Sequence, residues 1–481
     1  MIRVSTSTPI KKDRNMFSAF VIAYFIGMIW IGLSSVRRIR RIESFFVADR
    51  KGSTLLITGS LLATIVGGSS TVGLAGRGFS WGLVGAWWIL VGVAGLLLLS
   101  LFLARRIRRY GLYTLPEILE RQYGASVKLV ASLVIVCAWL GIIGGQIVAS
   151  GKILSTMMPG PLSAMMGLSA AVFIIYTLLG GQVSIIRTDA VQSAIMIVGI
   201  LFCAYFGYQR IGGVTAMKTH LPRDFLLFPV NSYFSWKDLM EWLVLIGSAY
   251  LVGPDIYSRL LSSRDGETAR RSVLLTALML IPLAFSIALI GMSARVLAPS
   301  LSGEDALPFM IREVLPWGIN ALVMAAILCA IMSSADTVLL TASTIFSMDI
   351  IKDLAERIRG RKLGERRILL LSRLAVIFFG LLALGFALKF RGVISLLLFG
   401  YSIYTAGLVV PVVLGFYRDK LRLNPVGATI AIVGGGGWVI LGKTVHWGPL
   451  GLEKLLGLSP GFQGVLLSLI LLFVGSYVSR R

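Results

Sequence analysis

The sequence is poor in the residue types that build most enzyme active sites and metal centres. Of its 481 residues, 14% are charged, two are His and three are Cys. Cys137, Cys203 and Cys329 each lie inside an apolar block without CxxC spacing, so neither a disulfide framework nor a zinc site is supported. Soluble domains carry about 25% charged residues. The scarcity of charge therefore excludes a soluble globular protein.

Acidic residues are especially few. The 22 Asp and Glu against 46 Lys and Arg give a net charge of +24. In a water-soluble chain, this excess would suggest a nucleic-acid partner. Here the basic residues mostly lie between apolar blocks, where they orient helices in a bilayer. We therefore expect the lipid bilayer as a partner, and no nucleic acid.

Long apolar runs are abundant: apolar residues make up 56% of the chain, and the mean hydropathy is +0.86. The runs are roughly 20 residues long, enough to cross about 30 Å of hydrocarbon. They predict an all-α membrane protein, one multipass domain over residues 1–481 with about 13 transmembrane helices. The predicted spans are 17–36, 54–80, 82–104, 127–150, 161–179, 189–208, 238–262, 273–297, 317–349, 368–388, 392–416, 425–442 and 460–478.

The basic residues predict how the helices are oriented. An odd number of spans places the termini on opposite sides of the membrane. Most Lys and Arg fall in alternate loops, beginning with the loop that contains Arg37 and Arg38. Because loops rich in Lys and Arg stay in the cytoplasm, we expect a plasma (inner) membrane protein with its N-terminus outside and its C-terminus in the cytoplasm.

Two predicted spans contain helix-breaking residues. Span 54–80 is interrupted from Gly67 to Ser70, and span 238–262 from Gly253 to Asp255. Glycine costs a helix about 1 kcal/mol and proline about 3 kcal/mol. Non-helical backbone inside a membrane is tolerated only where protein or a water-filled cavity satisfies its polar groups. Both breaks are therefore predicted to line a site, although small residues also permit close helix packing.

The two breaks occupy matching places in the chain. Each lies in the first helix of a five-helix set, the first set over 54–208 and the second over 238–416. Because five is odd, the second set enters the membrane from the opposite side, which makes an inverted repeat. Span 17–36 is then an extra N-terminal helix, and 425–478 supplies two C-terminal helices. Paired breaks in an inverted repeat indicate the midplane binding site of a secondary transporter.

Four acidic residues fall within or next to the predicted spans. A central Asp costs about 2.5 to 3.5 kcal/mol, so each needs a partner or a function. Asp189 opens a span and could form a capping box with Gln192. Glu241 is near a helix end and could be solvated. Asp255 lies four residues before Arg259, so an ion pair between them is an alternative to a functional role.

Asp336 is the hardest of the four to explain structurally. It follows a long apolar stretch, and no basic residue is near in sequence. Ser333, Asp336 and Thr337 share one helical face by i, i+3 and i+4 spacing. Such a stripe of oxygen atoms suits a hard cation. The hydroxyls alone would be weak evidence, because Ser and Thr often bond back to the carbonyl four residues earlier.

Four segments resemble recurrent patterns of the sodium:solute symporter family, whose members share a LeuT-type fold with one extra helix at the start. These segments are Tyr113 to Leu119, Gly180 to Gln192, Gly253 to Leu260, and Ala330 to Thr337 with Ser347 to Ile350. The resemblance runs from residue 17 to residue 420. It implies a LeuT-type 5+5 inverted repeat.

The resemblance also implies a sodium site. Its ligands would be the backbone carbonyls of Ala63, Val66 and Ala330 and the hydroxyls of Ser333 and Ser334. The residue types by themselves also favour a cation here. Unwinding after Val66 would free carbonyls at the C-terminal end of a half-helix, where cations are attracted. A second sodium held by Asp189, Asp336 and Thr337 with Ser333 is a further hypothesis that rests on residue type.

The sequence thus predicts a secondary transporter and no enzyme. It would carry a small organic solute, such as an amino acid, carboxylate or vitamin-like compound, into the cell with sodium by alternating access. The predicted solute contacts are Gly68, Ser69, Ser70, Gln146, Tyr250, Gly253 and Asp255. A proton-coupled symporter using Asp189 or Asp336 is the alternative. A polytopic membrane enzyme and a membrane sensor are disfavoured, since no hydrophilic cluster and no output domain are evident. The oligomeric state stays open.

Overall fold

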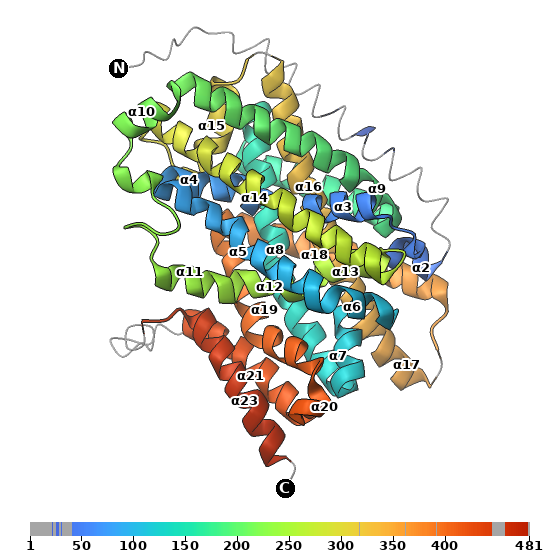
Figure 1. The fold of residues 1–481 in the computed structure, drawn as a ribbon. Coiled ribbons are helices and arrows are strands. Elements are labelled where there is room, and N and C mark those ends of the chain that lie inside the picture. The colour runs from blue at the N-terminus through green and yellow to red at the C-terminus, as the bar shows by residue number, and fades with distance from the viewer. Residues whose placement is uncertain are drawn as a thin grey trace.

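The structure is a computed structural model that describes residues 41–316, 318–360, 362–390, 392–444 and 457–479, together with Ile22, Ile26, Gly27 and Trp30. Throughout the described residues the chain forms helices and short connections, with two isolated β-bridges (Figure 1). This agrees with the predicted all-α class. Apart from those four residues, predicted span 17–36 lies outside the described part of the chain.

The helices follow one another along the chain with few long connections. Their bounds are α2 (Ile42–Val47), α3 (Thr54–Ile65), α4 (Leu74–Trp81), α5 (Trp87–Leu98), α6 (Ala104–Tyr110), α7 (Leu115–Tyr123), α8 (Ala125–Met157), α9 (Leu162–Ile211), α10 (Gly213–His220), α11 (Trp236–Trp242), α12 (Ser248–Val252), α13 (Pro254–Ser262), α14 (Gly266–Leu297), α15 (Ala306–Glu313), α16 (Ile319–Ile345), α17 (Asp353–Arg359), α18 (Glu365–Lys389), α19 (Val393–Gly415), α20 (Arg418–Leu421), α21 (Pro425–Thr444) and α23 (Pro460–Val478).

Helix α9 is two antiparallel arms that meet at Gly181. The backbone there adopts φ 49° and ψ −164°, a conformation that glycine tolerates and other residues rarely adopt. The Tyr176 hydroxyl lies 2.6 Å from Oγ1 of Thr188, whereas a straight helix would separate the two residues by about 18 Å. The arms correspond to predicted spans 161–179 and 189–208. The second arm begins at residue 182, so the predicted start at Asp189 is wrong.

A second reversal separates α4 from α5. Gly82 has φ 79°, and the position of a Cβ on Gly85 would be 2.7 Å from the backbone nitrogen of Gly78. Residues 69–80 of predicted span 54–80, together with span 82–104, are therefore the two arms of one helical stretch. Ten helical stretches of the described chain are long and apolar enough to cross a membrane, and two of these contain the reversals. Twelve predicted spans coincide with helical arms, and the full count of thirteen stays a prediction.

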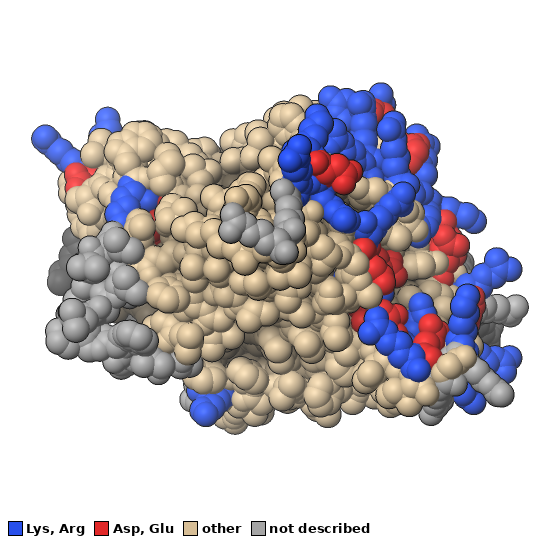
Figure 2. All heavy atoms as spheres, turned by 90° about the horizontal axis from the view of Figure 1, so that it is seen from below, with Lys and Arg blue, Asp and Glu red and all other residues tan. Residues whose placement is uncertain are grey.

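The outer surface fits a lipid environment. Along α18, Leu370, Leu374, Phe378 and Leu381 recur every three or four residues, and each is more than half exposed. On the face seen in Figure 2, charged residues gather at one end and are few at the other, with an uncharged band between. Arg105 of α6 pairs with Glu267 of α14. Such a band is typical of a membrane-spanning protein.

Helix α16 is the centre of the bundle. It is buried along almost its whole length and packs against α3, α8, α9 and α18. In Figure 1, α21 and α23 pack against α19 at the lower edge, away from this centre. Both broken helices, α3–α4 and α12–α13, lie inside the bundle. Polar groups on α16 are therefore positioned to meet the backbone that the breaks release.

Candidate functional site

The first predicted break is present at the end of α3. Helical geometry stops at Val66, which has φ −88° and ψ 68°, and a helical turn resumes at Ser69. The ideal Cβ of Gly67 would lie 2.4 Å from Oγ of Ser334 and 2.9 Å from Nε2 of Gln146. No side chain larger than hydrogen fits there without displacing these two groups. Glycine is therefore required by the closeness of α16 and α8.

The carbonyls released by this break accept hydrogen bonds from hydroxyl groups. Ser333 donates to the carbonyl of Ala63 over 2.9 Å and to that of Ala330 over 3.0 Å. Ser334 donates to the carbonyls of Ala63 and Thr64 over 3.0 and 2.7 Å. We call this group of five residues the hydroxyl–carbonyl cluster. It is fully buried and joins α3 to α16.

The hydroxyl–carbonyl cluster has the chemistry that a sodium ion needs. Hard cations bind oxygen atoms, and each serine hydroxyl can rotate to offer a lone pair in place of its proton. Four of the five predicted ligands, Ala63, Ala330, Ser333 and Ser334, come together in the cluster. The fifth, Val66, is the residue at which the backbone leaves the helix. That these groups bind sodium stays a prediction.

The second predicted break lies between α12 and α13. Gly253 adopts φ −56° and ψ 124°, and Pro254 begins α13. The Tyr404 hydroxyl of α19 donates to the carbonyl of Val252, the last residue of α12, over 2.5 Å. A buried hydroxyl thus satisfies a carbonyl that the break leaves without a helical partner. Both breaks are stabilised in the same way, by side chains from a neighbouring helix.

A cavity lies between the two breaks. Of the predicted solute contacts, Ser69, Gln146, Tyr250 and Asp255 line it. The other three lie at its margins: the Gly68 N–H donates to Oε1 of Gln146 over 2.8 Å, Ser70 donates to the carbonyl of Ile65 over 2.7 Å, and Gly253 forms the second break.

Sequence reasoning missed two aromatic residues of the cavity, Trp139 and Tyr401. Both lie in apolar spans, where aromatic residues usually belong to the packed core. Trp139 packs edge-to-face on Tyr404, with ring centroids 4.8 Å apart. Its indole nitrogen is buried without a hydrogen-bond partner among the described residues. No signal in the sequence distinguishes these residues from core aromatics.

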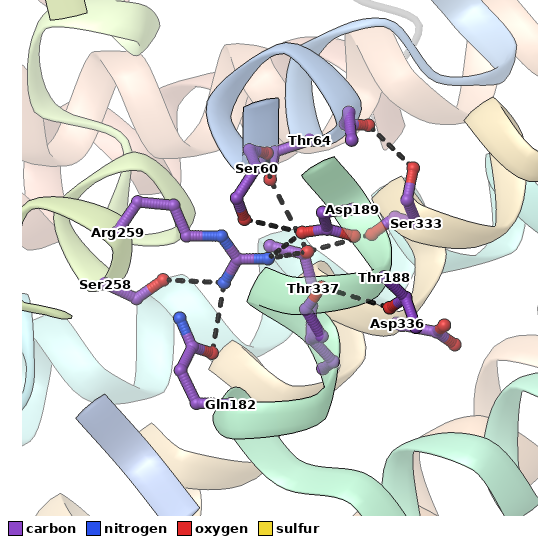
Figure 3. A network of polar contacts seen from close by, with 12 residues as sticks. Ser60, Thr64, Gln182, Thr188, Asp189, Ser258, Arg259, Ser333, Asp336 and Thr337 are labelled. Atoms are coloured by element: carbon purple, nitrogen blue, oxygen red, sulfur yellow. Dashed lines mark hydrogen bonds and ion pairs between the residues drawn. The ribbon is translucent and has the colours of Figure 1, made fainter. Parts of the chain in front are cut away.

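A second polar group surrounds the buried guanidinium of Arg259 (Figure 3). Arg259 lies 3.1 Å from the Asp189 carboxylate and donates to Oε1 of Gln182 over 3.0 Å and to the Thr337 hydroxyl. Ser60 also donates to Asp189, over 2.6 Å. The alternative ion pair between Asp255 and Arg259 is therefore wrong. The capping box at Asp189 is wrong as well, because the helix begins at residue 182.

Asp336 lies close to this group, but its carboxylate has fewer hydrogen-bond partners than that of Asp189. Thr177 donates to its Oδ1 over 3.2 Å, and its Oδ2 is buried without a partner among the described residues. In Figure 3 its carboxylate points away from the Arg259 guanidinium. Thr337 bonds back to the carbonyl of Ser333 over 2.8 Å. The predicted second set of sodium ligands is therefore split, with Asp189 and Thr337 held by Arg259 and Asp336 apart.

Solved structures with a similar fold are membrane symporters. A substrate-bound, outward-open Na⁺-coupled sialic acid symporter aligns with a TM-score of 0.82 and 18% identity, covering 96% of this chain and 98% of that one. Mhp1, a nucleobase-cation-symport-1 family transporter in a closed conformation, aligns with a TM-score of 0.60 and 13% identity, covering 91% and 94%. The chain is a polytopic membrane protein of the LeuT-type fold, as predicted.

The family model for the sodium:solute symporter family matches residues 45–435, so the chain belongs to that family, whose members are transporters and not enzymes. It is 28% identical over 408 residues to human sodium/glucose cotransporter 4 and 26% identical over 407 residues to mouse sodium/myo-inositol cotransporter 2. Each alignment covers 74% of this chain. The chain spans 58% and 59% of the length of these two relatives.

The requirement for glycine at the first break can be tested by Gly67→Ala. The added methyl group would collide with Ser334 and Gln146, and overpacking of this kind costs about 1 to 3 kcal/mol. We expect a lower melting temperature of the purified protein. Gly385→Ala on α18 is the matched control, because its Cβ would meet nothing within 4 Å. Equal melting temperatures for both variants would show that the break does not need glycine.

The buried pair of Arg259 and Asp189 gives a second prediction. Arg259→Gln leaves a buried carboxylate without its cation, at a cost of about 3 to 5 kcal/mol, so membrane abundance should fall. Adding Asp189→Asn removes the stranded charge and should restore part of the abundance. The control is Arg312→Gln, which breaks an exposed pair with Glu313. Failure of the double variant to recover would contradict a structural ion pair.

Proposed function

We propose that this protein is a secondary active transporter that moves a small organic solute into the cell together with sodium. The observation that supports this best is the direct connection between the hydroxyl–carbonyl cluster and the cavity. Thr64 belongs to both, because its carbonyl accepts from Ser334 and it is one of the residues that line the cavity. An ion in the cluster and a solute in the cavity would therefore act on the same turn of α3.

Sodium is the cargo ion in this proposal. When it binds, Ser333 and Ser334 would turn their hydroxyl lone pairs toward it and give up their hydrogen bonds to the carbonyls of α3. The ion would then hold the end of α3 against α16. The bound ion would thereby fix the backbone next to it, including Gly68, whose N–H donates to Gln146. This backbone borders the solute cavity, so the ion would hold part of the solute site in place. Mutual stabilisation of this kind is typically worth 1 to 3 kcal/mol.

A second cavity suggests how the solute would leave. It is lined by Pro254 and Ser258 of α13, together with Phe46 and Tyr113. The next residues of the same helix, Asp255 and Ile256, line the first cavity. Helix α13 therefore separates the two spaces. Movement of this half-helix would join them, consistent with rocking of one predicted five-helix set against the other.

The proposed direction of transport depends on the orientation of the chain. The family supports a multipass membrane location. We propose that the strongly charged end in Figure 2 faces the cytoplasm, because loops rich in Lys and Arg are retained there. The second cavity would then open toward the cytoplasm. The plasma (inner) membrane, the outer position of the N-terminus and the two-repeat division of the chain stay predictions.

Proton coupling is a second candidate function, and one observation favours it. Oδ2 of Asp336 is buried without a hydrogen-bond partner among the described residues, which is an arrangement that a bound proton would satisfy. A second sodium at Asp189, Asp336 and Thr337 would have to compete with Arg259, which already pairs with the Asp189 carboxylate. Uptake driven by a pH gradient without sodium would favour the proton.

The sodium assignment can be tested with Ser334→Ala in proteoliposomes. Loss of one ligand should raise the sodium concentration for half-maximal uptake about tenfold or more, the effect of about 1.4 kcal/mol. Apparent solute affinity at saturating sodium should change much less. The matched control is Ser343→Ala on the same helix, whose buried hydroxyl bonds only to the carbonyl of Leu339. Equal sodium dependence in both variants would contradict the assignment.

A further inference from the structure

The solute cavity contains a single carboxylate and no opposite charge. Asp255 lines it, and none of the described residues that line it is basic. Asp255 forms no ion pair with any described residue. Arg259, one helical turn away, is fully buried and directed to Asp189. The nearest cation in sequence is thus committed to another acid, which leaves the charge of Asp255 for something in the cavity.

Asp255 lies at the start of a half-helix inside the bundle, as the second residue of α13. The positive end of a helix dipole favours a negative charge there. An acidic side chain inside a membrane protein is costly, and one without an ion-pair partner among the described residues is a candidate for binding a solute or an ion.

The walls of the cavity combine a carboxylate with aromatic rings, which suits an organic cation. Trp139, Tyr250 and Tyr401 surround the space next to Asp255, and the aliphatic side chains of Ile142 and Val338 complete it. Aromatic rings attract ammonium groups through their faces, most strongly where water is excluded. Thr64, Ser69 and Gln146 also line the cavity and offer side-chain oxygen atoms to polar groups of a solute. The unpartnered indole N–H of Trp139 adds a donor for an oxygen atom of the solute.

We propose that the solute is a compact organic cation, with an ammonium group that binds between the Asp255 carboxylate and the aromatic rings and an oxygen atom that accepts from Trp139. This rests on the proposed function, because it names the solute of the same cavity. It differs from the neutral solutes in the names of the glucose and myo-inositol relatives.

The experiment is uptake into proteoliposomes with and without an inward sodium gradient. Choline and ethanolamine serve as cationic probes, myo-inositol and glucose as neutral ones, and sialic acid as an anionic one. We expect uptake of at least one cationic probe, and much slower uptake of the neutral and anionic probes. Asp255→Asn should raise the concentration for half-maximal uptake of that cation at least tenfold without changing sodium dependence. Asp419→Asn, which removes an acid from the short helix α20, is the matched control.

A second measurement, binding of the cationic probes to the purified protein, tests the inference even if a variant folds poorly. Choline or ethanolamine should raise the melting temperature of the natural protein in a saturable way. Trp139→Phe keeps an aromatic ring but loses the N–H, so it should weaken that effect several-fold without abolishing it. Asp255→Asn at normal membrane abundance should abolish it.

The outcomes separate this inference from the proposed function. Sodium-driven uptake of inositol, glucose or sialic acid with no uptake of cations would overturn the cationic solute and leave sodium symport intact. Uptake of a cation that needs no sodium but depends on Asp255 would support the cationic solute and overturn sodium symport. If neither cation is taken up or raises the melting temperature, the cationic solute is wrong.

Discussion

The structure depends on how the backbone released at the end of α3 is satisfied inside the membrane. A helix that stops at Ile65 leaves carbonyls without helical partners, and inside a membrane these must find other hydrogen-bond donors. Hydroxyls on the central helix α16 supply those hydrogen bonds. Because a hydroxyl can exchange a donated hydrogen bond for a lone pair, the same contacts that stabilise the break are the ones that a cation could replace. Stability and ion binding then use the same atoms.

Charge is divided between two places that lie close together. Arg259 balances Asp189 in a fully buried group, whereas Asp255 faces the cavity at the start of the same half-helix, α13. Movement of α13 would therefore carry both Asp255 and Arg259 relative to α9 and α16. This couples the solute cavity to the interior of the bundle through one rigid element. Because α13 borders both cavities, its movement could open one cavity toward the other.

Much of the fold and part of the site could be predicted from residue types with strong local preferences. Glycine and proline marked both breaks, and apolar length marked the spans. Pairings between distant segments could not be predicted: Arg259 is four residues from Asp255, yet it pairs with Asp189 seventy residues away. A reversal between spans 161–179 and 189–208 was predicted, but not its position at Gly181, because helical periodicity continues on both sides of that residue. Trp139 and Tyr401 lie in apolar segments, as aromatic residues of the packed core do. Only the three-dimensional arrangement shows that they line the cavity.

Sodium binding in the hydroxyl–carbonyl cluster can be tested without knowledge of the solute, by equilibrium binding of radioactive sodium to the purified protein. We expect saturable sodium binding in the natural protein and its loss in the double variant Ser333→Ala, Ser334→Ala at equal protein recovery. Saturable binding of unchanged affinity in the double variant would contradict it.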